Sequence, residues 1–172
     1  MRVAITGATA GIGRAFRDVF PIGPNFSRST GHNLIYPATI DTIVKQSSDC
    51  DAFINNAYYN FAQVDLLYKL WAEWQDKEKT IVCIGSDASD YSHPAPLPYA
   101  MHKRALQDAC LQLHHTKKTC RVLFVKPGYI DTPTVAHVND TKMNANDMAT
   151  YIRDLIIMNR TFWVPMITLS PT

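Results

Sequence analysis

The chain has 172 residues, a mass of 19.4 kDa and a formal net charge of +2. Apolar residues make up 47% and charged residues 19%, a globular composition that excludes a disordered chain. No apolar run is long enough to span a membrane, and the scattered Lys and Arg residues argue against a nucleic-acid-binding surface.

This length predicts one domain over residues 1–172. The chain begins with a strand-like segment rather than a signal peptide, so we expect a cytoplasmic protein. Its four cysteines form no Cys-x-x-Cys pair, and the six histidines have no metal-ligand spacing to them. We therefore expect free thiols in a reducing compartment and no metal site.

Short β-forming runs alternate with helical stretches along the chain. Strands are predicted at 2–6, 25–28, 33–36 (short and weak), 52–54, 80–85, 121–125 and 162–167. Helices are predicted at 11–20, 39–47, 61–77, 99–115 and 146–158, and three prolines predict a loop at 89–98. This alternation indicates an α/β fold, a Rossmann-like doubly wound parallel sheet flanked by helices in three α/β/α layers. Such sheets bind ligands at the carboxyl ends of their strands.

A glycine-rich loop, Thr6-Gly7-Ala8-Thr9-Ala10-Gly11-Ile12-Gly13, joins the first strand to the first helix. Glycines let the backbone approach a pyrophosphate, whose charge the helix amino terminus stabilises. The spacing is G-x-x-x-G-x-G rather than G-x-G-x-x-G, and no Gly-Lys-Ser/Thr follows, which excludes a P-loop. The loop favours a dinucleotide site over a glycine turn without a ligand.

The residues after the second predicted strand indicate which dinucleotide is bound. NAD sites carry an acidic residue about 20 positions beyond the loop, but no Asp or Glu lies between Asp18 and Asp41. Arg28, flanked by Ser27 and Ser29, suits a 2′-phosphate. We therefore expect NADP rather than NAD, the alternative being that Arg28 is a solvated surface residue.

Tyr99 and Lys103 are four residues apart at the start of a predicted helix and so share one face. A nearby ammonium lowers a tyrosine pKa, and such a tyrosine can move a proton to or from a carbonyl oxygen. By itself this pair is weak evidence for a site, because the same spacing often arises by chance in a surface contact. However, Ser86 lies thirteen residues before Tyr99, at the carboxyl end of a strand.

Together these motifs resemble the short-chain dehydrogenase/reductase family in its single-domain form. The glycine loop, Asn55-Asn56-Ala57, the serine, Tyr-x-x-x-Lys and Pro127-Gly128-x-x-x-Thr132 match in family order, from Thr6 to Thr132. The resemblance implies Tyr99 as general acid/base, Lys103 lowering its pKa and holding the nicotinamide ribose, and Ser86 bonding the reacting oxygen. It also implies that Asn60, in Asn-Phe-Ala-Gln-Val on the following helix, supports a water-mediated proton relay to the lysine; a helix N-cap is the alternative.

The resemblance also assigns the cofactor contacts. The residues expected at the phosphates are Gly7, Thr9, Gly11, Ile12 and Gly13. Those expected on the adenosine side are Asn56 and Ala57. Those expected around the nicotinamide amide are Pro127, Ile130 and Thr132.

The chain departs from the family by being short. Tyr58 replaces the usual glycine after Asn-Asn-Ala, and few residues follow Thr132 before the final helix. A short segment after Thr132 leaves the active site open. Either the substrate is small and loosely held, or a partner subunit closes the site. In the family the helices equivalent to 61–77 and 99–115 pair between subunits, so we expect a homodimer or homotetramer. Tyr68, Trp71 and Trp74 suit such an interface because aromatics are enriched there, and the alternative is that they pack on their own sheet.

The sequence thus predicts an NADP-dependent oxidoreductase that transfers hydride between nicotinamide and a small carbonyl or alcohol substrate. The alternative is a dinucleotide-binding sensor or scaffold without turnover, which the short lid favours. Nucleotide-sugar epimerases and dehydratases share the fold but usually have a different glycine spacing and a larger substrate domain.

Overall fold

The computed structural model describes residues 1–91, 95–158 and 161–172. Six parallel strands form one sheet in the order β2-β1-β3-β4-β5-β6. The strands are β1 (Val3–Thr6), β2 (Asn25–Phe26), β3 (Ala52–Asn55), β4 (Thr80–Ile84), β5 (Arg121–Pro127) and β6 (Met166–Leu169).

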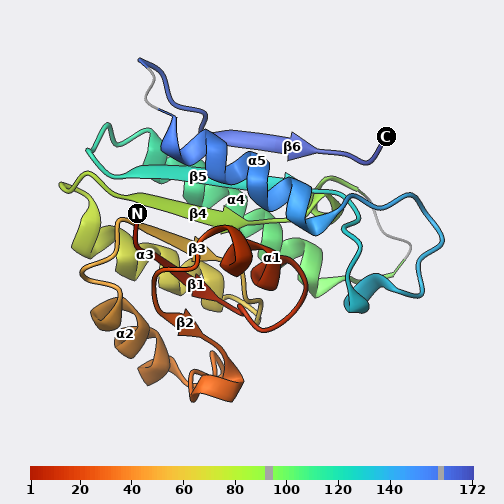
Figure 1. Ribbon diagram of the computed structural model, residues 1–172, viewed down its shortest axis with the longest axis horizontal. Coiled ribbons are helices and arrows are strands. Elements are labelled where there is room, and N and C mark those ends of the chain that lie inside the picture. The colour runs from red at the N-terminus through yellow and green to blue at the C-terminus, as the bar shows by residue number, and fades with distance from the viewer. Residues whose placement is uncertain (92–94, 159–160) are drawn as a thin grey trace.

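Five α-helices cover the two faces of this sheet (Figure 1). They are α1 (Gly11–Val19), α2 (Pro37–Gln46), α3 (Ala62–Trp74), α4 (Pro98–His114) and α5 (Ala145–Ile157). Helices α1 and α5 pack on one face, and α2, α3 and α4 pack on the other. The predicted three-layer α/β/α architecture is therefore confirmed.

The alternation of side chains along each strand supplies both halves of the core. In β1, Ala4 faces the α2–α4 layer while Val3 and Ile5 face α1 and α5. Trp74, at the end of α3, is fully buried beneath the sheet. Because both faces are covered, successive residues in the middle of the central strands are apolar rather than alternately polar.

The strand order reverses at β1, since β2 lies on one side of it and β3 on the other. The chain therefore leaves β1 and β3 at the point of the sheet edge where open α/β sheets bind ligands. The glycine loop follows β1 and Asn56 follows β3 at this edge. The topology thus brings the predicted cofactor segments together.

The predicted strand at 33–36 was wrong, because these residues form a turn. Asn33 closes it by accepting from the Tyr36 amide through its carbonyl (3.1 Å) and from the Ile35 amide through its side chain (3.2 Å). Pro37 then begins α2 at a position where proline is favoured. The predicted loop at 89–98 begins later than expected, because Asp87–Asp90 is a 3₁₀ helix; residues 92–94 lie outside the described part of the chain.

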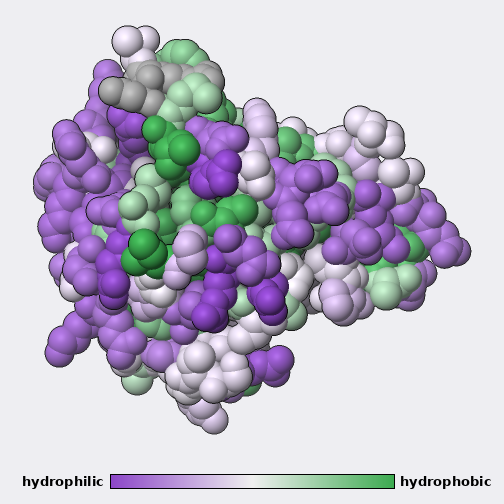
Figure 2. All heavy atoms as spheres, viewed as in Figure 1, coloured by the Kyte–Doolittle hydropathy of each residue, from purple (hydrophilic) through white to green (hydrophobic). Residues whose placement is uncertain are grey.

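Two of the three aromatic residues considered for a subunit interface take the alternative position. Trp71 and Trp74 are buried against the chain's own sheet, as the alternative had it. Tyr68 is exposed and donates to the Gln112 side chain across α3 and α4 at 2.6 Å. Most of the face in Figure 2 is hydrophilic, with hydrophobic residues in small areas near its middle. Within the described ranges, no helix combines the length and apolar character that crossing a membrane needs.

Candidate active site

The glycines of the glycine loop stand at positions where a side chain would not fit well. Gly7 and Gly11 have φ values of +74° and +53°, a region that favours glycine. A Cβ on Gly13 would lie 2.1 Å from the Gly7 carbonyl oxygen. The loop therefore folds back tightly on the first turn of α1, as a phosphate-binding loop requires.

The amino terminus of α1 keeps amide groups available for an anion. Its N-cap residue, Ala10, makes no side-chain cap bond, and the first turn holds no acidic residue. Helix amino termini carry unpaired N–H groups and partial positive charge. This cradle fits the pyrophosphate of a dinucleotide.

The Asn55-Asn56-Ala57 segment is tied to the end of β1. The Thr6 hydroxyl accepts from the backbone amides of Asn56 (2.9 Å) and Ala57 (3.0 Å), and the Asn56 side chain donates to the Thr6 carbonyl (3.1 Å). Ala57 lies against Gly7: a Cβ added to Gly7 would be 3.1 Å from the Cβ of Ala57. The Asn56 side chain therefore fixes the loop, and Asn56 and Ala57 lie beside it as predicted.

Arg28 lies next to the glycine loop, as the sequence predicted. The Gly7 amide donates to the Phe26 carbonyl at 2.7 Å, and Arg28 begins a 3₁₀ turn two residues later. Its side chain is exposed and forms no ion pair with any described residue. A guanidinium in this position is free to contact a phosphate.

The segment after β5 also approaches the glycine loop. The Thr132 methyl carbon lies 3.2 Å from where a Cβ on Gly11 would stand. Pro127 is buried at the end of β5, and Ile130 is buried and bridged to Met143. Thr9 is exposed on the loop, while Ile12 packs partly into the core.

Ser86, Tyr99 and Lys103 are brought together at the ends of β4 and α4. Ser86 follows Gly85 at the carboxyl end of β4, and its side chain lies near enough to Tyr99 to act on the pKa of the phenol in the lowering direction. Lys103 Nζ lies 5.4 Å from the centre of the Tyr99 ring, one helical turn away. This is the grouping that the sequence predicted.

Lys103 is 3% exposed and is held by two acceptors. Its Nζ donates to Gln63 Oε1 and to the Ile84 carbonyl, both at 2.7 Å. Burial lowers the pKa of Lys103 from its ordinary 10.5 to about 7, while Cys83 acts in the raising direction. Sequence reasoning missed Gln63, although it stands within the segment quoted for Asn60.

In the protein alone, the pKa of Tyr99 is raised rather than lowered. Burial raises the pKa of Tyr99, and the nearby Ser86 side chain only partly offsets this rise. The Tyr58 and Asp87 charges add to the rise. A lysine whose own pKa is about 7 is only partly charged at neutral pH, so it attracts the phenolate weakly.

Asn60 is not where the resemblance implied. Helix α3 begins at Ala62 with Phe61 as its N-cap, so Asn60 lies before the helix and is not its cap. It is exposed and has a φ of +42°, a left-handed conformation that asparagine tolerates. Asn60 therefore turns the chain between β3 and α3.

The sequence analysis gave no role in the site to two residues beside the tyrosine: it noted Tyr58 only as the replacement of a glycine, and it missed Asp87. Tyr58 packs edge-on against Tyr99, with ring centres 4.9 Å apart, and its hydroxyl bonds to His102 Nδ1 at 2.8 Å. Asp87, directly after Ser86, is half-buried, and burial raises the pKa of its carboxyl. Adjacency to the Asn-Asn-Ala and serine motifs was the signal that could have identified both.

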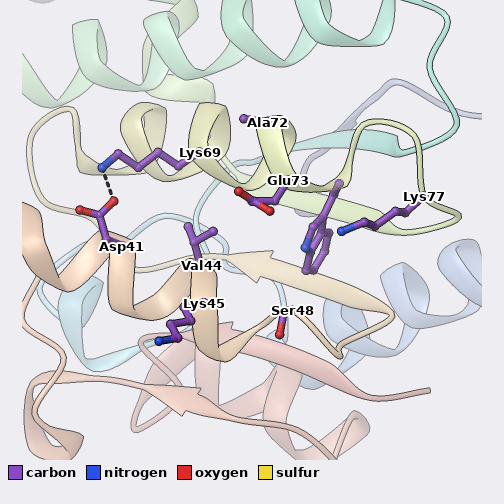
Figure 3. A pocket seen from close by; sticks show the side chains of 9 residues that line it. Asp41, Val44, Lys45, Ser48, Lys69, Ala72, Glu73 and Lys77 are labelled. Carbon is purple, nitrogen blue, oxygen red and sulfur yellow. Dashed lines mark hydrogen bonds and ion pairs between the residues drawn. The ribbon is translucent and has the colours of Figure 1, made fainter.

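A groove of about 480 Å³ lies elsewhere, between α2 and α3 (Figure 3). Lys69 and Asp41 form an ion pair at one end of it. None of the residues that line it belongs to the predicted site. The grouping of Ser86, Tyr99 and Lys103 beside the glycine loop is therefore the better candidate.

Comparisons with known proteins were made by sequence and by structure. No protein-family model matches the sequence, and no curated protein matches it. A short chain dehydrogenase from Burkholderia cenocepacia in complex with NADP superposes with a TM-score of 0.81 at 15% identity, covering 98% of this chain and 89% of that chain. An alcohol dehydrogenase from Thermococcus sibiricus complexed with 5-hydroxy-NADP gives 0.77 at 17% identity, covering 98% and 96%.

L-Sorbose reductase from Gluconobacter frateurii, complexed with NADPH and L-sorbose, gives a TM-score of 0.76 at 15% identity, covering 99% of this chain and 95% of that one. At these identities the likeness concerns the fold. The fold agrees with the ordered motifs from Thr6 to Thr132. The chain therefore has the fold of the short-chain dehydrogenases/reductases.

Proposed function

We propose that this protein is an NADP-dependent oxidoreductase acting on a small carbonyl or alcohol substrate. The observation that carries the proposal is the convergence of Ser86, Tyr99 and Lys103 next to a glycine loop with an uncapped helix amino terminus. Structural neighbours solved with NADP or NADPH support the choice of cofactor.

The glycine loop and the first turn of α1 would hold the pyrophosphate, and Arg28 would bind the 2′-phosphate. Thr132, Ile130 and Pro127 would border the nicotinamide side, and Asn56 and Ala57 the adenosine side. NADP, when bound, supplies or accepts the hydride.

The chain's own residues would handle the proton. The Tyr99 hydroxyl would donate it to the substrate oxygen during reduction and take it back during oxidation. The Ser86 hydroxyl, which lies near Tyr99, would hold the same oxygen in place. Lys103, as an ammonium, would stabilise the Tyr99 phenolate.

Turnover separates this proposal from a sensor without catalysis. The purified chain is mixed with NADPH and a panel of small aldehydes and ketones, and NADPH absorbance is followed. We expect oxidation that depends on at least one carbonyl compound. Binding of NADPH with no oxidation across the panel would instead favour the sensor, which the open site also fits.

A further inference from the structure

The Gln63 side chain has its orientation set by its neighbours. Nε2 donates to the Asn55 carbonyl at 2.8 Å and to the Ile84 carbonyl at 3.3 Å. Carbonyl oxygens only accept, so the amide nitrogen must face them and Oε1 must face Lys103. Reversing the amide would place its oxygen against two carbonyls and its nitrogen against an ammonium.

Gln63 is also held through its backbone. The Asn55 side chain donates to the Gln63 carbonyl at 2.8 Å, so the two residues exchange side-chain-to-backbone bonds. Gln63 lies in the first turn of α3 and is 2% exposed. Its Oε1 is therefore a fixed acceptor, joined to the ends of β3 and β4.

We propose that Gln63 is the positioning residue for Lys103, accepting its hydrogen bond directly and taking the supporting role that the resemblance assigned to Asn60. This inference rests on the proposed function, in which Lys103 stabilises the Tyr99 phenolate. Among the described residues, Gln63 Oε1 and the Ile84 carbonyl are the two acceptors of Nζ. An ammonium has three donors, so one N–H remains for the nicotinamide ribose.

Several titratable groups surround Lys103 besides these acceptors. The Tyr58 and Tyr99 rings lie 5.4 Å from Nζ, and Cys83 faces it from β4. Both acceptors stabilise the charged form against burial. Removing one of them should therefore lower the pKa of Lys103 further, by about one unit or more.

The test is an NMR titration of the full chain carrying isotope-labelled lysine, with Lys103→Met identifying the signal. Gln63→Met removes the acceptor at similar size and should lower the Lys103 pKa. Gln63→Glu places a carboxylate there and should raise it, which keeps the test sharp if the Met variant does not fold. Gln107→Met is the matched control: Gln107 is a buried amide one turn further along α4 whose Oε1 has no partner among the described residues. In Gln107→Met, the pKa of Lys103 should equal its value in the wild type.

The turnover arm uses the same variants with NADPH and an accepted carbonyl compound. Activity that needs the Lys103 ammonium falls as pH rises through the pKa of Lys103. This falling limb of the pH–activity profile should move to lower pH in Gln63→Met and to higher pH in Gln63→Glu. The substrate KM should stay constant while kcat changes. A wild type that oxidises NADPH, with folded variants that leave both the pKa and the limb unmoved, would overturn the inference alone. A wild type that oxidises no NADPH would overturn the proposed function and, with it, the catalytic role of Gln63.

Discussion

The glycine-loop half and the tyrosine half of this sheet edge are built in different ways. Around the loop, the structure depends on backbone: positive φ at Gly7 and Gly11, and a close approach of Gly13 to the Gly7 carbonyl. Around the tyrosine, it depends on buried side chains, above all the Lys103 contact with Gln63. The spacing of glycines in the sequence predicts the backbone of the loop directly. Which residue supports Lys103, Asn60 or Gln63, depends instead on where helix α3 begins.

The largest effect is expected in the tyrosine half, from Tyr99→Phe. Removing the hydroxyl removes the proposed acid, so turnover should fall by about 10²–10⁴-fold while NADPH affinity is kept. Turnover and nicotinamide fluorescence measure the two quantities. Tyr58→Phe is the control, because it deletes the neighbouring hydroxyl that bonds to His102. Equal turnover in Tyr99→Phe and the wild type would show that another group moves the proton.

In the loop half, Arg28→Glu tests which dinucleotide is bound preferentially. A carboxylate would repel the 2′-phosphate, so NADPH affinity should fall about 10–100-fold relative to NADH affinity. Titration of both nucleotides gives the ratio. Lys117→Glu makes the same charge change at an exposed position at the other edge of the sheet, after α4. A ratio that moves as much in the control as in Arg28→Glu contradicts the assignment.

Gly13→Ala probes the tightness of the loop. The added methyl would meet the Gly7 carbonyl oxygen at 2.1 Å, so we expect about 1–3 kcal/mol of lost stability and weaker NADPH binding. Gly31→Ala is the control, since its φ is +82° but no atom lies within 4 Å of the new Cβ. Urea unfolding and NADPH titration should separate the two: Gly31→Ala should lose some stability and no affinity. Unimpaired NADPH binding by Gly13→Ala would argue against the loop as the phosphate site.

The smallest effect concerns Lys103 and pH. Its pKa is lowered to about 7 in the folded chain, so above this pH the unfolded chain binds more protons. The free energy of unfolding should therefore rise with pH, by about 1 kcal/mol between about pH 7 and 8. Lys103→Met should lack this component. Identical pH slopes for the two proteins in urea unfolding would show that Lys103 titrates at its ordinary value.

Much of the fold and site followed from local patterns. Apolar runs located the strands at Val3–Thr6, Ala52–Asn55 and Thr80–Ile84, and parallel topology placed the glycine loop, Asn56 and Ser86 at one edge. The weak strand at 33–36 was wrong because Asn33 and Pro37 favour a turn and a helix start. The position of Trp74 stayed open because periodicity does not distinguish a core aromatic from an interface aromatic.

Gln63 could not be found from spacing, for a related reason. The predicted helix begins at residue 61 and the observed one at Ala62, and element ends are the least certain part of a sequence prediction. The pKa of Tyr99 was likewise predicted from charge alone, whereas burial, which only the fold reveals, is its largest cause.

The central claim is that this edge of the sheet binds NADP through the glycine loop and Arg28. Titration of the purified chain with NADPH and with NADH, followed by nicotinamide fluorescence, tests it without knowledge of the substrate. The account predicts saturable binding of both, tighter for NADPH. Binding of neither nucleotide would contradict it.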